Sequence, residues 1–183
     1  MDFSGRVWGA TRAEHSAPYP CDRLVTAPSE GWTRAVDIAA SPAHVFKWLR
    51  QLTIAPYSYD WIDFRGRRSP HALLPTPPDL SVGQPFLVFE IASFTTDEHI
   101  TGLLPVALAK RHGHMAVSYA VRPHGAGSRL IVKVITETGG TTRQRLRRRI
   151  LAWGDLVMMR KQLLTLKKLA EGSAEPEANA ANA

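Results

Sequence analysis

One long helix at the end of the chain constrains the fold more than any other feature. Gly139 and Gly140 interrupt the preceding pattern, Thr141 or Thr142 can cap a helix, and the helical pattern continues to about Glu171. At about 1.5 Å per residue such a helix is roughly 40 Å long, enough to cross a whole domain. Apolar residues at helical spacing predict its buried stripe: Leu146, Ile150, Trp153, Val157 and Leu164.

Alternating residues before this helix predict a sheet. In the first run Trp32 and Val36 share one face, and Thr33 and Ala35 share the other. The later runs are separated by short connections, which favour antiparallel neighbours. The expected strands are 32–38, 61–68, 84–93, 97–106, 114–122 and 129–137.

The last expected strand has one aliphatic and one charged face. Leu130, Val132 and Val134 occupy the first, whereas Arg129 and Lys133 occupy the second. We therefore expect the aliphatic face to point inward and the charged face to be solvated.

Ser41 and Pro42 mark the start of a short helix, because serine is a favoured N-cap and proline suits the first helical position. Pro56 ends this pattern, and a second short helix or turn should carry residues 57–60. The proline-rich segment 74–78 should be a surface loop. The apolar side of the first helix is formed by Val45, Phe46, Trp48, Leu49 and Leu52.

Size and composition indicate a single soluble domain, and the order of the expected strands and helices places it in the α+β class. The chain has 183 residues, of which 44% are hydrophobic and 21% charged. No apolar run approaches the roughly 20 residues that span a bilayer, and no secretory signal is visible, so we expect a cytoplasmic protein. Cys21 is the only cysteine, which excludes an internal disulfide and a cysteine-based zinc site. The expected organisation is a partly ordered arm (1–29), one domain (30–171) and a disordered tail (172–183).

The net charge of +7 favours acidic partners, and its distribution is uneven. One interpretation of the arginine run at the start of the long helix is a solvated helix end. The alternative is contact with a membrane surface or an acidic protein. We expect no nucleic-acid partner, because no recognised motif accompanies the run. The run consists of Arg143, Arg145, Arg147, Arg148 and Arg149.

Three segments resemble the SRPBCC superfamily, which includes START domains, birch-pollen allergens and polyketide cyclases. Residues 39–49 look like its strand followed by a Ser-Pro helix start, and residues 80–86 resemble its Leu-x-Val-Gly turn. Residues 55–63 are similar to an uncharacterised bacterial branch. The resemblance covers about 31–171 and implies a helix-grip fold, in which a curved antiparallel sheet wraps around a long C-terminal helix.

The resemblance also implies a cavity between sheet and helix that takes up apolar ligands. Members of the superfamily are lipid carriers, hormone receptors, chaperone co-activators or cyclases, so the fold leaves the function open. The cyclase-type members work without a cofactor, and we predict none here. The residues expected to face the ligand are Tyr57, Trp61, Val88, His99, Tyr119, Val132, Trp153, Val157 and Arg160.

Candidate catalytic residues are few. Asp60 and Asp63 are the nearest thing to a carboxylate pair, and Tyr59 lies beside them. An acid/base role requires a carboxyl group with a raised pKa in an apolar setting. The structural alternative is a turn, a cap or a partner for nearby arginines.

Glu90 and Arg160 both interrupt apolar patterns. Glu90 lies in an otherwise apolar strand, and Arg160 falls on the predicted stripe of the long helix. An internal ion pair between them, an Arg160 contact to an acidic ligand, or an Arg160 side chain that reaches solvent would each explain the pattern.

Histidines at 99, 112 and 114 raise the question of a metal. His112 and His114 would share one face of a strand, but no third ligand is apparent, so we predict no metal site.

Two functions from different classes follow, with a third behind them. The first is binding of a small hydrophobic or aromatic molecule in the cavity. The second is a cofactor-independent cyclase or aromatase in which Glu90, Asp60 or Tyr59 moves a proton. The third is an adaptor that docks an acidic partner through the arginine run.

Overall fold

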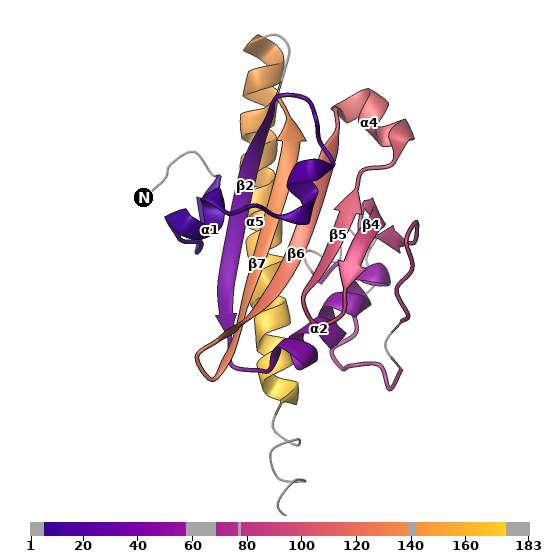
Figure 1. The fold of residues 1–183 in the computed structure, drawn as a ribbon, viewed down its shortest axis with the longest axis vertical. Helices are drawn as coiled ribbons and strands as arrows, with labels where there is room; N and C mark the ends of the chain where they lie inside the picture. The colour runs from indigo at the N-terminus through magenta and orange to yellow at the C-terminus, as the bar shows by residue number, and fades with distance from the viewer. Residues whose placement is uncertain (1–5, 58–68, 77, 139–141, 175–183) are drawn as a thin grey trace, which may run out of the picture.

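The computed structural model describes residues 6–57, 69–76, 78–138 and 142–174 and has a helix-grip architecture of the α+β class (Figure 1). The strands form one sheet in the order β1-β2-β7-β6-β5-β4-β3, in which only β1 and β2 are parallel. Its strands are β1 Val7–Trp8, β2 Ser29–Ile38, β3 Pro85–Phe86, β4 Phe89–Thr95, β5 His99–Leu103, β6 Met115–His124 and β7 Gly127–Glu137. Its helices are α1 Arg12–Ser16, η1 Pro20–Arg23, α2 Pro42–Arg50, η2 Gln51–Thr53, α4 Val106–His112 and α5 Thr142–Ser173.

The long helix and the short helix α2 cover the inner face of the sheet. Figure 1 shows α5 running behind β2 and β7, with α2 beside its C-terminal half. The predicted start of α2 is confirmed, because the Ser41 hydroxyl accepts a hydrogen bond from the His44 amide at 3.3 Å and Pro42 is the first helical residue. Trp48 and Leu49 of α2 are fully buried in the main core with Leu163 and Leu166 of α5.

The buried stripe of α5 differs from the prediction at the two positions that can be compared, because the side chains of Leu146, Ile150 and Trp153 lie outside the described residues. Val157 and Leu164 are 51% and 42% exposed, whereas Leu163, Leu166 and Ala170 are buried. The observed stripe keeps helical spacing but contains no charged residue, so the arginine that interrupted the predicted stripe falls on the exposed side. The prediction chose a different row because apolar residues lie on several sides of this part of the helix.

Residues 6–28, expected as an extended arm, contain β1, α1 and η1 and cross the outer face of the sheet (Figure 1). Tyr19, Cys21 and Val25 are buried against Ile131 and Ile135 of β7 in a second apolar cluster. This cover overturns the expectation of a solvated face on β7.

Lys133, for example, is only 7% exposed. Its ammonium group lies 2.9 Å from the Asp22 carboxylate and donates to the Ala17 carbonyl oxygen. The charged side of β7 is therefore buried because the N-terminal segment supplies its partners.

The segment 84–93, predicted as one strand, forms a tight hairpin. Phe86 of β3 pairs with Phe89 of β4, and Leu87 and Val88 make the turn between them. Leu87 has φ +58°, a left-handed conformation that costs a residue with a β-carbon about 1–2 kcal/mol. No glycine or asparagine signals this turn, so the continuous apolar run 86–89 conceals it.

Candidate ligand-binding site

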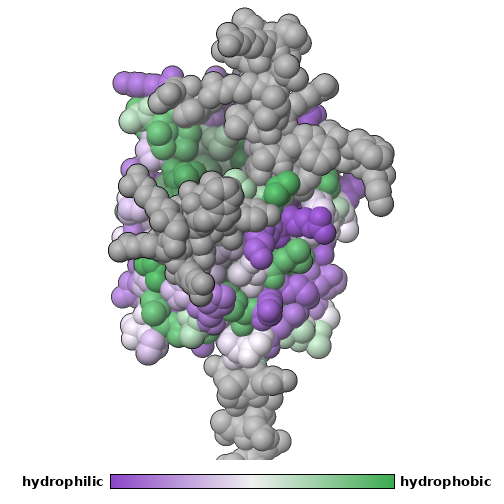
Figure 2. All heavy atoms as spheres, turned by 180° about the vertical axis from the view of Figure 1, so that it is seen from behind, coloured by the Kyte–Doolittle hydropathy of each residue, from purple (hydrophilic) through white to green (hydrophobic). Residues whose placement is uncertain are grey.

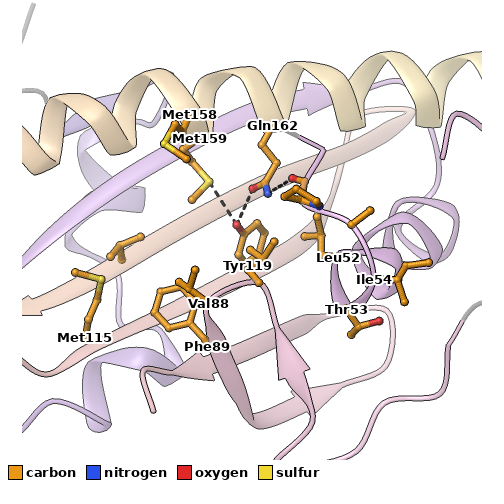
Figure 3. A pocket seen from close by; sticks show the side chains of 14 residues that line it. Leu52, Thr53, Ile54, Val88, Phe89, Met115, Tyr119, Met158, Met159 and Gln162 are labelled. Carbon is orange, nitrogen blue, oxygen red and sulfur yellow. Dashed lines mark hydrogen bonds between the residues drawn. The ribbon is translucent and has the colours of Figure 1, made fainter. Parts of the chain in front are cut away.

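A pocket of about 520 Å³ lies between α5, the inner face of the sheet and the segment that follows α2 (Figure 3). Seen from the α5 side, apolar surface lines a hollow in the molecule (Figure 2). In the described part of the chain every lining residue is uncharged. These residues are Leu52, Thr53, Ile54, Ala55, Pro56, Leu87, Val88, Phe89, Met115, Tyr119, Val134, Met158, Met159 and Gln162.

Besides the residues of β6 and β7, three parts of the chain build the wall. The segment 52–56 contributes one side: η2 ends at Thr53, and the Pro56 carbonyl oxygen accepts a hydrogen bond from Gln162 of α5. The turn between β3 and β4 contributes Leu87 and Val88, and Val88 forms a rim because it is 61% exposed. The helix α5 closes the pocket with Met158, Met159 and Gln162, and the last two point toward the sheet (Figure 3).

A short chain of hydrogen bonds crosses the pocket. The Tyr119 hydroxyl of β6 donates to Gln162 Oε1 at 2.7 Å, and Gln162 Nε2 donates to the Pro56 carbonyl oxygen. Met159 Sδ lies 3.5 Å from the same hydroxyl. These contacts tie β6, α5 and the segment after η2 together, and they place polar atoms in an otherwise apolar wall.

Gly102 leaves room for Phe89 and Phe86 to lie close to β5. A β-carbon on Gly102 would lie 2.7 Å from Phe89 Cβ and 3.4 Å from Phe86 Cδ1. Phe86 in turn makes an edge-to-face contact with Tyr119, with ring centroids 5.4 Å apart. Glycine at position 102 thus allows β5 to approach the aromatic pair that supports the pocket.

The residues predicted to face a ligand have different places in the structure. Val88 and Tyr119 line the pocket. Tyr57 is buried in the core instead, where its hydroxyl accepts a hydrogen bond from Gln51 Nε2 at 2.6 Å and its ring meets Trp48 edge-on. Val132 is buried beside Tyr119 on β7 but does not contribute to the wall.

The other predicted positions lie apart from the wall. His99 is half-buried on β5, where burial lowers the pKa of its imidazole. Val157 and Arg160 lie on the exposed side of α5. Tyr59, Asp60, Trp61 and the side chain of Trp153 lie outside the described residues.

The ion pair between Glu90 and Arg160 does not form. Glu90 is exposed on β4, near one edge of the sheet. The Arg160 guanidinium lies 5.5 Å from the ring centroid of Trp8, which belongs to β1 at the opposite edge. Four strands separate the two charges, so Arg160 takes the surface position that was one of its three predicted outcomes.

Other candidate groups also have structural roles. His114 donates its backbone N–H to Glu137, and the side chain of His112 is outside the described residues. In the described ranges no three His, Cys, Asp or Glu side chains gather into a possible metal site. Cys21 is buried on the outer face, and burial raises the pKa of its thiol to about 11.

The arginine run occupies the first turns of α5, at the end of the molecule where α4 also lies (Figure 1). The side chains of these arginines are outside the described residues.

Several wall residues were not predicted. No sequence motif marks these residues, and only Gln162 could have been inferred from the sequence. They are the segment 52–56, Leu87, Met115, Met158, Met159 and Gln162. Gln162 adjoins the row Met159, Leu163 and Leu166, which faces the sheet. Once this row is known to face inward, an amide beside it indicates a polar group directed into the protein.

Comparison with known proteins gives similarity at the level of architecture. No family model matches the chain, and no curated protein matches it. The solution structure of the KanY protein (ms6282) is 16% identical, with a TM-score of 0.49, and covers 79% of this chain and 99% of its own. Protein Ms6760 from Mycobacterium smegmatis is 13% identical, with a TM-score of 0.49, and the match covers 85% of this chain and 96% of that protein. Ara h 8.0201 is 9% identical, with a TM-score of 0.41, and covers 75% and 98%.

Because these TM-scores are below 0.5, the helix-grip assignment depends on the strand order and on the position of α5. Within the described ranges, no helix combines the length and the apolar character needed to span a membrane.

Proposed function

We propose that this chain is a ligand-binding domain of the SRPBCC type, which encloses a small hydrophobic or aromatic molecule beneath α5. The pocket is the observation that carries the proposal. Its volume of about 520 Å³ falls within the range of roughly 300–1,000 Å³ typical of small-molecule sites. Its described wall is apolar apart from a few neutral polar groups, which is also typical of such sites.

Burial of apolar surface would supply the affinity. Removing about 500 Å² from water, counted over ligand and wall, contributes about 12 kcal/mol. Association costs of about 5 kcal/mol leave a Kd on the order of 10 µM. Three methionines in the wall can adjust their rotamers to ligands of different outline: Met115, Met158 and Met159.

The cyclase alternative requires a proton-transfer group at the pocket. In the described wall the Tyr119 hydroxyl is bonded to Gln162, and no carboxylate is present. Glu90 is exposed outside the wall, and Asp60 and Tyr59 are outside the described residues. Binding is therefore the function that this geometry supports best.

Fluorescence titration with N-phenylnaphthylamine, an uncharged probe of apolar sites, tests the proposal. We expect saturable binding to the wild-type protein and at least tenfold weaker binding to Met159→Trp, because the indole would fill the pocket from α5. Leu164→Trp is the matched control, since Leu164 is 42% exposed on the same helix and outside the wall. Absence of binding, or equal binding by both variants, would contradict the proposal. Native mass spectrometry of the freshly purified protein would show whether a small molecule co-purifies.

A further inference from the structure

We infer that the pocket selects an uncharged ligand that carries a hydroxyl or carbonyl group, and that Gln162 binds this group. The inference rests on the proposed function and adds the chemical class and the orientation of the ligand. It depends on the charge of the wall and on the hydrogen bonds of a single buried amide.

The wall offers no partner for a charge. Its lining residues in the described part of the chain are all neutral, although 21% of the whole chain is charged. Glu90 is the charged residue next to the hairpin Phe86–Phe89, and it is exposed outside the wall. An ionised ligand group buried against such a wall would lose hydration worth several kcal/mol without compensation. An uncharged ligand avoids this cost.

The orientation of the Gln162 amide follows from its partners. The Pro56 carbonyl oxygen can only accept a hydrogen bond, so the amide nitrogen must face it. The amide oxygen then faces Tyr119, whose hydroxyl must donate. This 2.7 Å bond is also stronger than the alternative bond to the thioether of Met159, because sulfur is a weak acceptor.

The two described partners together use half of the hydrogen-bonding capacity of this amide. A glutamine amide has two N–H donors and two oxygen lone pairs, and Pro56 takes one donor while Tyr119 takes one lone pair. Gln162 is only 4% exposed, so bulk water does not readily serve the other two. A ligand hydroxyl can accept from the second N–H and donate to the second lone pair, and a carbonyl can accept from the N–H.

A carboxylate fits the same place poorly. It could accept the N–H, but it would bring negative charge next to the amide oxygen, with no cation in the described wall. In Figure 3 the amide lies on the α5 side of the pocket, whereas Phe89, Val88 and Met115 lie away from it. The ligand would place its polar group at α5 and its apolar body toward the β3–β4 turn.

Three probes with one ring system test the inference: naphthol, methylnaphthalene and naphthoate, substituted at the same ring position. Each would displace N-phenylnaphthylamine from the wild-type protein at neutral pH, where only naphthoate is ionised. We expect naphthoate to bind at least tenfold more weakly than naphthol. Equal or tighter binding of naphthoate would overturn the selection for uncharged ligands.

Gln162→Met separates the role of the amide from general apolar binding. This variant should lower the affinity for naphthol about fivefold relative to that for methylnaphthalene, because the substitution removes both hydrogen-bonding groups of the amide at nearly constant side-chain volume. Gln51→Met is the matched control: Gln51 is fully buried and bonded to the Leu74 amide, but it is not in the wall. It should leave the ratio of the two affinities within twofold of wild type.

The outcomes distinguish the two proposals. An unchanged ratio in Gln162→Met would overturn the role of Gln162 while leaving apolar binding intact. Failure of N-phenylnaphthylamine to bind the wild-type protein would overturn the proposed function and this inference with it.

Discussion

The two faces of the sheet are both covered, but in different ways. The inner face meets α5 and α2 through apolar side chains and leaves a pocket of about 520 Å³. The outer face carries a row of polar residues on four neighbouring strands, in register and almost fully buried. This row consists of Thr33, Lys133, Ser118 and Thr101.

Residues 15–22 satisfy the polar row on the outer face. The Cys21 amide donates to the Ser118 hydroxyl at 3.0 Å, and Ser118 and Thr101 share a hydrogen bond of 2.8 Å. His15 lies 2.9 Å from the Thr33 hydroxyl. These directional bonds fix the distance between cover and sheet, because a hydrogen bond tolerates little variation in length.

The difference shows that the cover, more than the sheet, determines where space remains. On the outer face the N-terminal segment is held close by hydrogen bonds and ion pairs. On the inner face, α5 is in contact through long side chains such as Met159, and the Leu87–Val88 turn stands beside a gap. The same sheet therefore supports a packed layer on one side and a binding site on the other.

Large-to-small substitutions on the two faces should show the difference between them most strongly. Ile131→Ala removes a side chain that is 1% exposed in the outer cluster and should lower the free energy of unfolding by about 2–5 kcal/mol. Met159→Ala removes a wall residue whose space joins an existing pocket, so its cost should be about 1 kcal/mol. Urea unfolding of both variants measures the difference. Equal losses would show that the pocket wall is as tightly packed as the outer face.

Most of the architecture is predictable because it depends on periodicity. The strand at 32–38, the Ser-Pro helix start and the long terminal helix all follow from local patterns, and the structure confirms them. The order of the elements and the resemblance of residues 39–49 and 80–86 are sufficient for the helix-grip fold.

The candidate site is much less predictable, because its residues share no pattern. The Leu87–Val88 turn has a positive φ without glycine, so the sequence there reads as a continuous strand. The row of α5 that faces inward could not be chosen from a segment with apolar residues on several sides. The buried outer face was missed for a third reason: its partners lie about 110 residues away in the N-terminal segment.

Small-to-large substitutions test whether each face of the sheet has free space. Ala116→Leu on the outer face should lower the free energy of unfolding by about 1–3 kcal/mol, because Ala116 is fully buried in a packed cluster. Ala55→Leu should cost less than about 1 kcal/mol, because Ala55 lines the pocket and its larger side chain can enter existing space.

Thermal unfolding and titration with N-phenylnaphthylamine measure both effects. Ala55→Leu should lower the affinity for the probe about tenfold. Ala116→Leu should leave this affinity unchanged at temperatures where the protein is folded. A stable Ala116→Leu protein would mean that the outer face also contains usable space.

The smallest expected effect concerns the ionic contacts of the outer cover. The Arg129 guanidinium binds the Glu14 carboxylate through two hydrogen bonds of 2.7 and 2.9 Å, and it also contacts Asp37 and the Gly9 carbonyl oxygen. This hydrogen bonding holds the pKa of Glu14 at about 2, below its ordinary value of 4.5. The contact joins α1 to β7 and so attaches the N-terminal segment to the sheet.

Because the folded-state pKa of Glu14 is depressed, its contribution to stability is complete above pH 4.5 and is lost as the pH falls toward 2. Glu14→Gln should therefore lower the free energy of unfolding by about 1 kcal/mol at neutral pH, allowing for solvent screening. It should also make the free energy of unfolding depend less steeply on pH between pH 4.5 and 2. Arg129→Lys keeps the charge but loses the paired geometry, so it should show most of the same loss. Urea unfolding at several pH values provides the measurement. If the free energy of unfolding of Glu14→Gln depended on acidic pH as steeply as that of the wild type, α1 would be attached to the sheet by its apolar contacts alone.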